Sequence, residues 1–290
     1  MRCCAFVYVA AFAVLSAATV VGAQPQALAI PQRIISLSPH ATELLFSAGA
    51  GDKVVAVSES CDYPEAVKQL PKVSGYRGTN VEAVVALKPD VVVAWPSGNR
   101  TADIDAIKRF YIRVHVSELS TLAGITAEVR RFGEWASNSD AKKAALQRAH
   151  EADKRVDTLR KRFAAARKLR VFYQLGSGRL FTLTDKHVIG EALAVCGAEN
   201  VFGALALPAP EVSYEAVLAA QPDAVVLADA KFVDAVVVEW QTRQLFPAAT
   251  ARQRIVAVDG ALLHRPTLRT FGAVQAMCES IDQVRQALKH

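Results

Sequence analysis

The stretch Glu82–Ala94, which reads EAVVALKPDVVVA, returns later in the chain as Glu215–Leu227, EAVLAAQPDAVVL. Eight of the 13 aligned positions are identical, and Glu43–Ala50 resembles Glu191–Ala198 upstream of each copy. Each copy is typical of a helix that ends at a Pro-Asp pair and leads into a buried strand. Such units also look alike in unrelated α/β proteins. Read as a duplication, the pattern predicts two similar α/β lobes with a cleft between them, the usual place for a small ligand.

The first 23 residues have the features of a secretion signal. Arg2 gives a positive start, Ala5–Ala18 is almost unbroken apolar sequence, and Val21–Ala23 supplies small residues for cleavage. We expect the mature chain to begin at Gln24. The alternative is an uncleaved membrane anchor, because the apolar run is nearly long enough to span a bilayer. No basic stop-transfer cluster follows it.

The charge of the chain is moderate and partly local. Its formal net charge is +6, and Asp140–Arg170 holds 11 basic and 4 acidic residues. In an exported protein such a segment is more often a solvated helix face than a nucleic-acid site. We therefore expect no nucleic-acid partner.

The central segment differs from its flanks, in which strands alternate with helices as parallel βα units. Residues 139–168 contain neither Gly nor Pro, and their apolar residues recur at helical spacing. A helix of that length extends about 45 Å. We predict an α/β fold with an N-terminal lobe (24–138), a linking backbone helix (139–168) and a C-terminal lobe (169–290), the chain crossing once between lobes.

Candidate ligand-binding residues follow predicted strands, because ligands of open α/β sheets bind beyond the carboxyl ends of the strands. Their aromatic rings and basic groups favour a flat, largely apolar ligand with a polar rim. Each residue alone has a structural alternative, such as a core-capping Trp95 or a surface His264. The candidates are Tyr63, Tyr76, Arg77, Trp95, Phe181, His264 and Arg265.

Several motifs, in one order along nearly all of the mature chain, resemble the periplasmic cobalamin-binding proteins of ABC importers. The resemblance rests on Arg33–Pro39 with Thr42 and Glu43, Asp62–Pro64, Glu82–Trp95, Val195–Phe202 and Pro210–Glu215. It implies a monomeric periplasmic protein that captures cobalamin or a related corrinoid. Cobalamin would be cargo, not a cofactor, passed to a permease and ATPase complex in the inner membrane.

The resemblance also implies roles for individual residues. Tyr63, Tyr76, Trp95 and Phe181 would pack against the corrin ring and its nucleotide loop, with Arg77 in the same group of loops. His264 and Arg265 would meet the amide rim of the ligand.

Glu82 and Glu215 would be the surface carboxylates that dock into the transporter, and the duplication suits a two-fold symmetric permease. The alternative is that both acids simply favour the positive end of a helix dipole. Cysteine spacing alone does not choose a disulfide among Cys61, Cys196 and Cys278. The resemblance implies Cys196–Cys278 and a free Cys61.

Alternative functions stay open. Tyr76 stands where a cobalamin binder has tryptophan, and Ala209 replaces another aromatic residue. The Gly-Tyr-Arg sequence around Tyr76 also resembles haem-binding proteins that ligate iron through tyrosine, and a ferric-siderophore binder is a further possibility. A secreted enzyme is a remote alternative, since no His-Glu-x-x-His, Gly-x-Ser-x-Gly or phosphate-loop pattern occurs. We expect no metal site of the protein's own.

Overall fold

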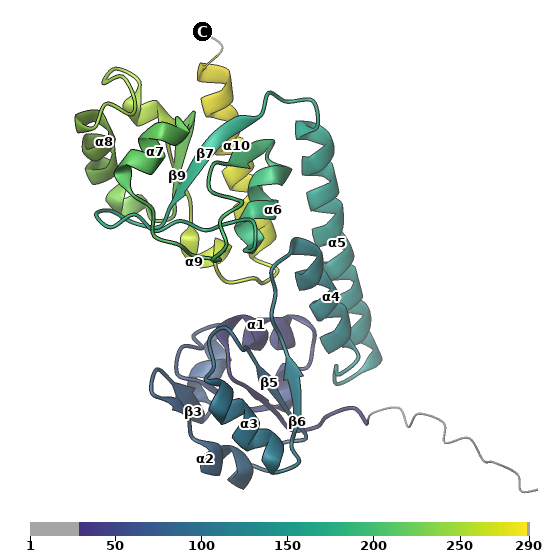
Figure 1. Ribbon diagram of the computed structural model, residues 1–290. Helices are drawn as coiled ribbons and strands as arrows, with labels where there is room; N and C mark the ends of the chain where they lie inside the picture. Colours follow the sequence, from purple (N-terminus) through teal and green to yellow (C-terminus); the bar gives the residue numbers. More distant parts are fainter. Residues whose placement is uncertain (1–28, 289–290) are drawn as a thin grey trace, which may run out of the picture. The chain divides into compact units, whose positions relative to one another are not determined.

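Two β-sheets, one in each half of the chain, organise residues 29–288, the part that the structure describes (Figure 1). The structure is a computed structural model. The predicted signal peptide, residues 1–23, lies outside the described residues.

The first sheet has the strand order β4-β3-β2-β1-β5-β6, and its neighbouring strands run parallel except for the β3–β4 pair. The strands are β1 (Ile34–Ser36), β2 (Val54–Ser58), β3 (Lys72–Gly75), β4 (Gly78–Thr79), β5 (Val91–Ala94) and β6 (Arg113–Val116). Strands β1 and β5 are completely buried at its centre, which explains why their residues are apolar except for Ser36.

The second sheet is parallel throughout, in the order β10-β9-β7-β8. Its strands are β7 (Leu169–Gln174), β8 (Ala198–Asn200), β9 (Ala224–Leu227) and β10 (Ile255–Ala257). The α-helices of both halves are α1 (Pro39–Ser47), α2 (Val81–Ala86), α3 (Thr101–Arg109), α4 (Leu122–Gly133), α5 (Ser139–Phe163), α6 (Val188–Val195), α7 (Tyr214–Ala220), α8 (Val233–Thr242), α9 (Gly260–Leu263) and α10 (Thr270–Ala287). The predicted fold class, two α/β lobes joined by a long helix, is confirmed (Figure 1).

The two copies of the repeated stretch fold in the same way. Helix α2 is capped by Asn80, whose side chain accepts from the N–H of Ala83 at 3.0 Å, and α7 by Ser213, which accepts from Ala216 at 3.1 Å. Each helix leads into a fully buried strand, β5 or β9, in the interior of its sheet. A side-chain acceptor at this position satisfies one of the free N–H groups of the first turn.

The aspartate of each Pro-Asp pair has the same structural role in both lobes. Asp90 accepts a hydrogen bond from the backbone N–H of Arg33 at 2.9 Å, and Asp223 accepts one from Arg170 at 2.9 Å. The guanidinium of Arg33 also donates to the carbonyl of Leu87 at the end of α2, at 2.7 Å. That of Arg170 donates to the carbonyl of Ala220 at the end of α7, at 2.8 Å. The aspartates therefore tie the start of one strand to the start of its neighbour, β1 to β5 and β7 to β9.

Helix α5 is the predicted backbone helix, with 25 residues and a length of about 38 Å. Its buried residues recur at the predicted helical spacing and are Ala145, Ala149, Ala152, Val156, Leu159 and Phe163, whereas Ala166, the last apolar residue of the predicted stripe, lies beyond the helix. The helix ends at Phe163, and residues 164–168 form the connection into β7 because the chain must reverse direction there. The N–H of Ala166 closes this turn on the carbonyl of Phe163 at 3.1 Å.

Helix α4 packs along α5 and also connects the lobes (Figure 1). At its start, the N–H of Leu122 donates to Glu191 of α6 in the second lobe at 2.6 Å. Beyond its end, the carbonyl of Trp135 accepts from Lys53 of the first lobe at 2.8 Å. The expectation of a single crossing is therefore wrong, because the segment before α4, α4 itself and α5 each pass between the lobes.

Candidate ligand-binding site

A cavity of about 420 Å³ lies between the two lobes. Its first-lobe wall follows the carboxyl ends of β1, β5 and β6, where ligands of parallel sheets bind. The first lobe contributes Pro39, His40, Trp95, Ser97, Glu118, Leu119 and Ser120, and the second contributes Lys186, His187, Pro208, His264, Arg265 and Pro266. The cleft predicted from the duplication is therefore present and lined by both lobes.

The indole of Trp95 is held firmly in the first-lobe wall. Its Nε1–H donates to Oε1 of Glu118 at 3.0 Å, and the other carboxylate oxygen accepts from the N–H of Ser97 at 3.0 Å. The backbone N–H of Trp95 donates to the Asn99 side chain at 2.7 Å. The His40 ring meets the indole edge-on at 5.4 Å. This wall thus offers a preformed aromatic surface to a ligand.

His40 lies behind that surface as an uncharged imidazole. Its Nε2 donates to the backbone carbonyl of Ser117 at 3.1 Å. Burial, which outweighs the hydrogen bond and the nearby carboxylates, lowers the pKa of His40 below its ordinary value.

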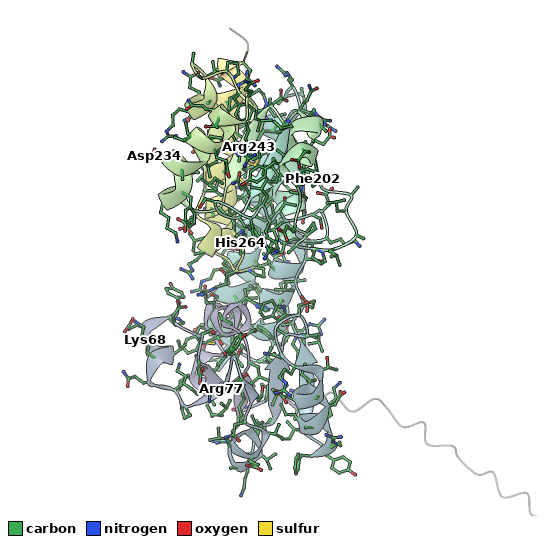
Figure 2. All side chains as sticks on the ribbon, turned by 60° about the vertical axis from the view of Figure 1, so that its left-hand side comes forward. Lys68, Arg77, Phe202, Asp234, Arg243 and His264 are labelled. Atoms are coloured by element: carbon green, nitrogen blue, oxygen red, sulfur yellow. A yellow bond between two sulfur atoms is a disulfide. The ribbon has the colours of Figure 1, made fainter. Side chains whose placement is uncertain are left out.

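The second-lobe wall carries two further neutral imidazoles, His187 and His264, whose rings lie 6.1 Å apart. Burial and then the neighbouring His264 lower the pKa of His187 to about 4. Burial also lowers the pKa of His264, whose Nε2 is hydrogen-bonded to the Tyr173 hydroxyl at 2.9 Å. Figure 2 shows His264 at the end of the second lobe that faces the first. The two rings are therefore polar and uncharged, and the charged groups of this wall are their sequence neighbours Lys186 and Arg265.

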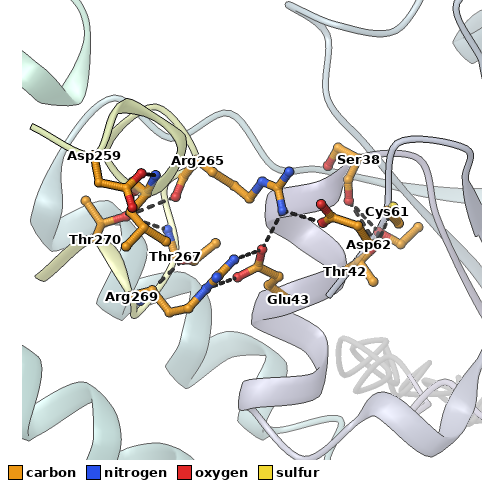
Figure 3. A network of polar contacts seen from close by, with 12 residues as sticks. Ser38, Thr42, Glu43, Cys61, Asp62, Asp259, Arg265, Thr267, Arg269 and Thr270 are labelled. Atoms are coloured by element: carbon orange, nitrogen blue, oxygen red, sulfur yellow. Dashed lines mark hydrogen bonds and ion pairs between the residues drawn. The ribbon is translucent and has the colours of Figure 1, made fainter. Parts of the chain in front are cut away.

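A network of ion pairs joins the lobes beside the cavity (Figure 3). Glu43 of α1 is only 2% exposed and accepts a bidentate pair from Arg269, at 2.6 and 3.0 Å. Arg265 donates through Nη1 to Glu43 at 2.9 Å and to Asp62 at 2.6 Å, and this contact holds the pKa of Asp62 below its ordinary value. The guanidinium of Arg269 lies 4.2 Å from the centre of the Tyr63 ring.

The structure brings three of the seven predicted ligand-binding residues to the cavity: Trp95, His264 and Arg265. The other four do not line its walls. Tyr63 is about half exposed and stacks under Arg269 beside the cavity, and Phe181 lies under Arg179 at the surface.

Tyr76 and Arg77 form the turn between β3 and β4, and the side chain of Tyr76 is fully exposed. The backbone carbonyl of Arg77 accepts a hydrogen bond from the Arg100 guanidinium at 3.1 Å. The side chain of Arg77 lies on the first lobe (Figure 2). Ligand contact by these exposed residues stays a prediction.

His40 and His187 belong to the cavity wall although neither was predicted. Both residues carry a weak sequence signal, since each lies at or next to the start of a helix. Metal-ligand spacing among the histidines does not identify these two as residues of a cavity wall. Among residues 29–288, no three His, Cys, Asp or Glu side chains are grouped so that they could hold a metal ion.

The two cysteines implied by the resemblance do form a disulfide, Cys196–Cys278, between the end of α6 and α10. Cys61 is free and buried, and burial raises the pKa of its thiol. Its sulfur lies 3.2 Å from the Thr42 hydroxyl in the network of Figure 3.

Glu82 and Glu215 are both exposed and occupy the same place, the first turn of the repeated helix. Hydrogen bonds from the Glu215 backbone and from Ser213 lower the pKa of the Glu215 carboxyl. No helix within residues 29–288 combines the length and apolar character that a bilayer crossing requires.

Two α/β lobes that enclose a cavity and share a helical backbone define a ligand-binding protein. The sequence agrees, since residues 34–259 match the family model described as periplasmic binding protein. The chain belongs to this family.

Its relatives include proteins named for vitamin B12. The chain is 36% identical over 256 residues to the vitamin B12-binding protein of Vibrio campbellii, a match that covers 88% of this chain and 91% of the relative. The crystal structure of the periplasmic vitamin B12 binding protein BtuF of Vibrio cholerae is similar with a TM-score of 0.78 and 32% identity, over 89% of this chain and 99% of that one. A periplasmic haem binding protein from Pseudomonas aeruginosa gives a TM-score of 0.68 and 25% identity, over 86% and 92%.

Proposed function

We propose that this protein binds vitamin B12 or a related corrinoid in the cavity between its lobes and delivers it to an ABC-type importer. The observation that carries the proposal is the interlobe cavity walled by Trp95, in a chain 36% identical to a vitamin B12-binding protein over nearly nine tenths of its length. The fixed indole supplies a flat apolar face, and the imidazoles of His187 and His264 supply a polar, uncharged rim.

The haem alternative has less support. It needs the tyrosine of the β3–β4 turn, Tyr76, as an iron ligand, and this side chain is fully exposed and does not line the cavity. The relatives named for vitamin B12 are also more similar in sequence than the haem-binding structure.

The remaining parts of the proposal follow from this role. The chain would reach the periplasm through a signal peptide cleaved before Gln24 and act as a monomer. It would carry the corrinoid as cargo, with neither catalysis nor a resident cofactor, and Glu82 and Glu215 would contact the permease.

A pair of titrations tests the ligand. We expect the purified mature chain to bind cyanocobalamin with a micromolar or lower Kd by calorimetry, and to bind haemin more weakly. A haem Soret band that disappears in Tyr76→Phe, together with no heat from cyanocobalamin, would overturn the proposal in favour of haem.

A further inference from the structure

Most charged groups of the cavity wall are already bound within the protein. Both oxygens of Glu118 accept hydrogen bonds from the Trp95 loop, and Arg265 is paired with two carboxylates. The ammonium group of Lys186 donates to the carbonyl of Ala206 at 2.5 Å. A carbonyl does not neutralise an ammonium group, so Lys186 is the one cation of the wall, among the described residues, without a carboxylate partner.

His187, which lines the cavity, is different because one hydrogen bond fixes its ring and its other nitrogen has no hydrogen-bond partner within the described residues. It caps α6, and its Nδ1 accepts from the backbone N–H of Ile189 at 3.2 Å. Within the described part of the chain, this is the one hydrogen bond of the ring. Since Nδ1 must present a lone pair, a neutral imidazole carries its proton on Nε2.

The surroundings of His187 keep the ring neutral at pH 7. His264 lies 6.1 Å away, and beyond it is Tyr173, whose pKa is raised by burial. The charged residues of the same cavity wall are Glu118, Lys186 and Arg265. The one carboxylate among the cavity-lining residues, Glu118, has both oxygens hydrogen-bonded to the Trp95 loop, so no anion is a hydrogen-bond partner of the His187 ring within the described residues. The ring is thus a neutral donor at a polar wall of the cavity.

We propose that His187 is a ligand-binding residue whose Nε2–H donates to an uncharged oxygen acceptor, an amide carbonyl, on the rim of the bound corrinoid. The inference rests on the function proposed above. A neutral donor satisfies an amide oxygen, whereas a carboxylate at the same place would lose its hydration and share the cavity with the carboxylate of Glu118. The cavity should therefore prefer ligands whose rim carries amides over ligands whose rim carries carboxylates.

The substitution His187→Asn separates ligand contact from helix capping. Asparagine is a good N-cap residue, so its side-chain oxygen can still accept from Ile189. Its side chain is too short to replace Nε2 at the cavity wall. Thermal unfolding of the unliganded variant should match the wild type, which shows that the fold is intact. His150→Asn, on the exposed side of α5, is the matched control.

We expect His187→Asn to raise the Kd for cyanocobalamin roughly 3- to 10-fold, the effect of one lost hydrogen bond, with no change in the control. Purified monocarboxylic acids of cyanocobalamin, each with one propionamide hydrolysed, test the charge preference. At least one isomer should bind the wild type more than about 10-fold more weakly than the parent, and this ratio should shrink in the variant, as expected for coupled groups.

Equal affinity of wild type and variant for cyanocobalamin, or equal affinity of the wild type for all the acids and the parent, would overturn the role of His187. A wild type that does not bind cyanocobalamin at all would instead overturn the proposed function, and the inference with it. The two failures are distinguished by the wild-type titration alone.

Discussion

Glu43 shows how one residue can join two lobes. Removal of a carboxylate from water costs several kcal/mol unless partners replace the lost hydration. Here Arg269 and Arg265 of the second lobe supply those partners, so both oxygens of Glu43 are satisfied across the boundary. Because Arg265 also lines the cavity, this contact helps to set the spacing of the cavity walls.

We expect Glu43→Gln to lower the free energy of unfolding by about 3 kcal/mol, because an amide cannot balance the two guanidinium groups. Urea unfolding followed by circular dichroism measures the change. Glu65→Gln is the matched control, since its pair with Lys68 is exposed and exposed pairs contribute at most about 1 kcal/mol. Equal losses in the two variants would show that the buried network has no special role.

At the scale of elements, the disulfide Cys196–Cys278 links the end of α6 to the middle of α10 across 82 residues of sequence. Both helices pack against α5, and the core they share contains Val195, Val274 and Ile281. The link therefore restricts the unfolded second lobe while lying inside an already packed layer.

Replacement of Cys196 and Cys278 by serine should lower the free energy of unfolding by about 2–5 kcal/mol, because the unfolded chain regains the freedom of a long loop. Reductant should destabilise the wild type in a guanidinium titration and leave the double variant unchanged. Buried Cys61, present in both proteins, controls for effects of reductant on a free thiol. A wild type indifferent to reductant would contradict the prediction.

At the scale of the whole molecule, the duplication places equivalent carboxylates on the two lobes. Glu82 and Glu215 share the same helix position, the same kind of cap and the same exposure. A first-turn acid gains only about 0.3–1 kcal/mol from the helix dipole. A two-fold symmetric partner that binds both carboxylates would account for their equivalent positions on the two lobes.

We expect Glu82→Ala combined with Glu215→Ala to leave the Kd for cyanocobalamin unchanged and to weaken stimulation of the cognate permease in proteoliposomes by 10-fold or more. The control replaces Glu65 and Glu279, exposed acids of the first and second lobe, by alanine. Full stimulation by the Glu82 and Glu215 variant would refute the docking role.

The predictions from sequence succeeded where local pattern and burial carry the information. The repeated stretch predicted both helices and both buried strands, and the apolar periodicity of residues 139–168 predicted α5. At the site, the rule for strand ends found Trp95, and the resemblance supported His264 and Arg265 as site residues; all three line the cavity. The same reasoning also selected Tyr76, which lies beyond a strand end but on an exposed turn.

What the sequence determined by itself is the pair of α/β lobes and their shared helix, because periodicity, caps and Pro-Asp breaks act over a few residues. Tertiary structure alone decided which side chains meet across the cleft. Glu43 and Arg265 are 222 residues apart, and no local pattern predicts their contact. The return of α4 between the lobes likewise depends on contact between segments that are distant in sequence.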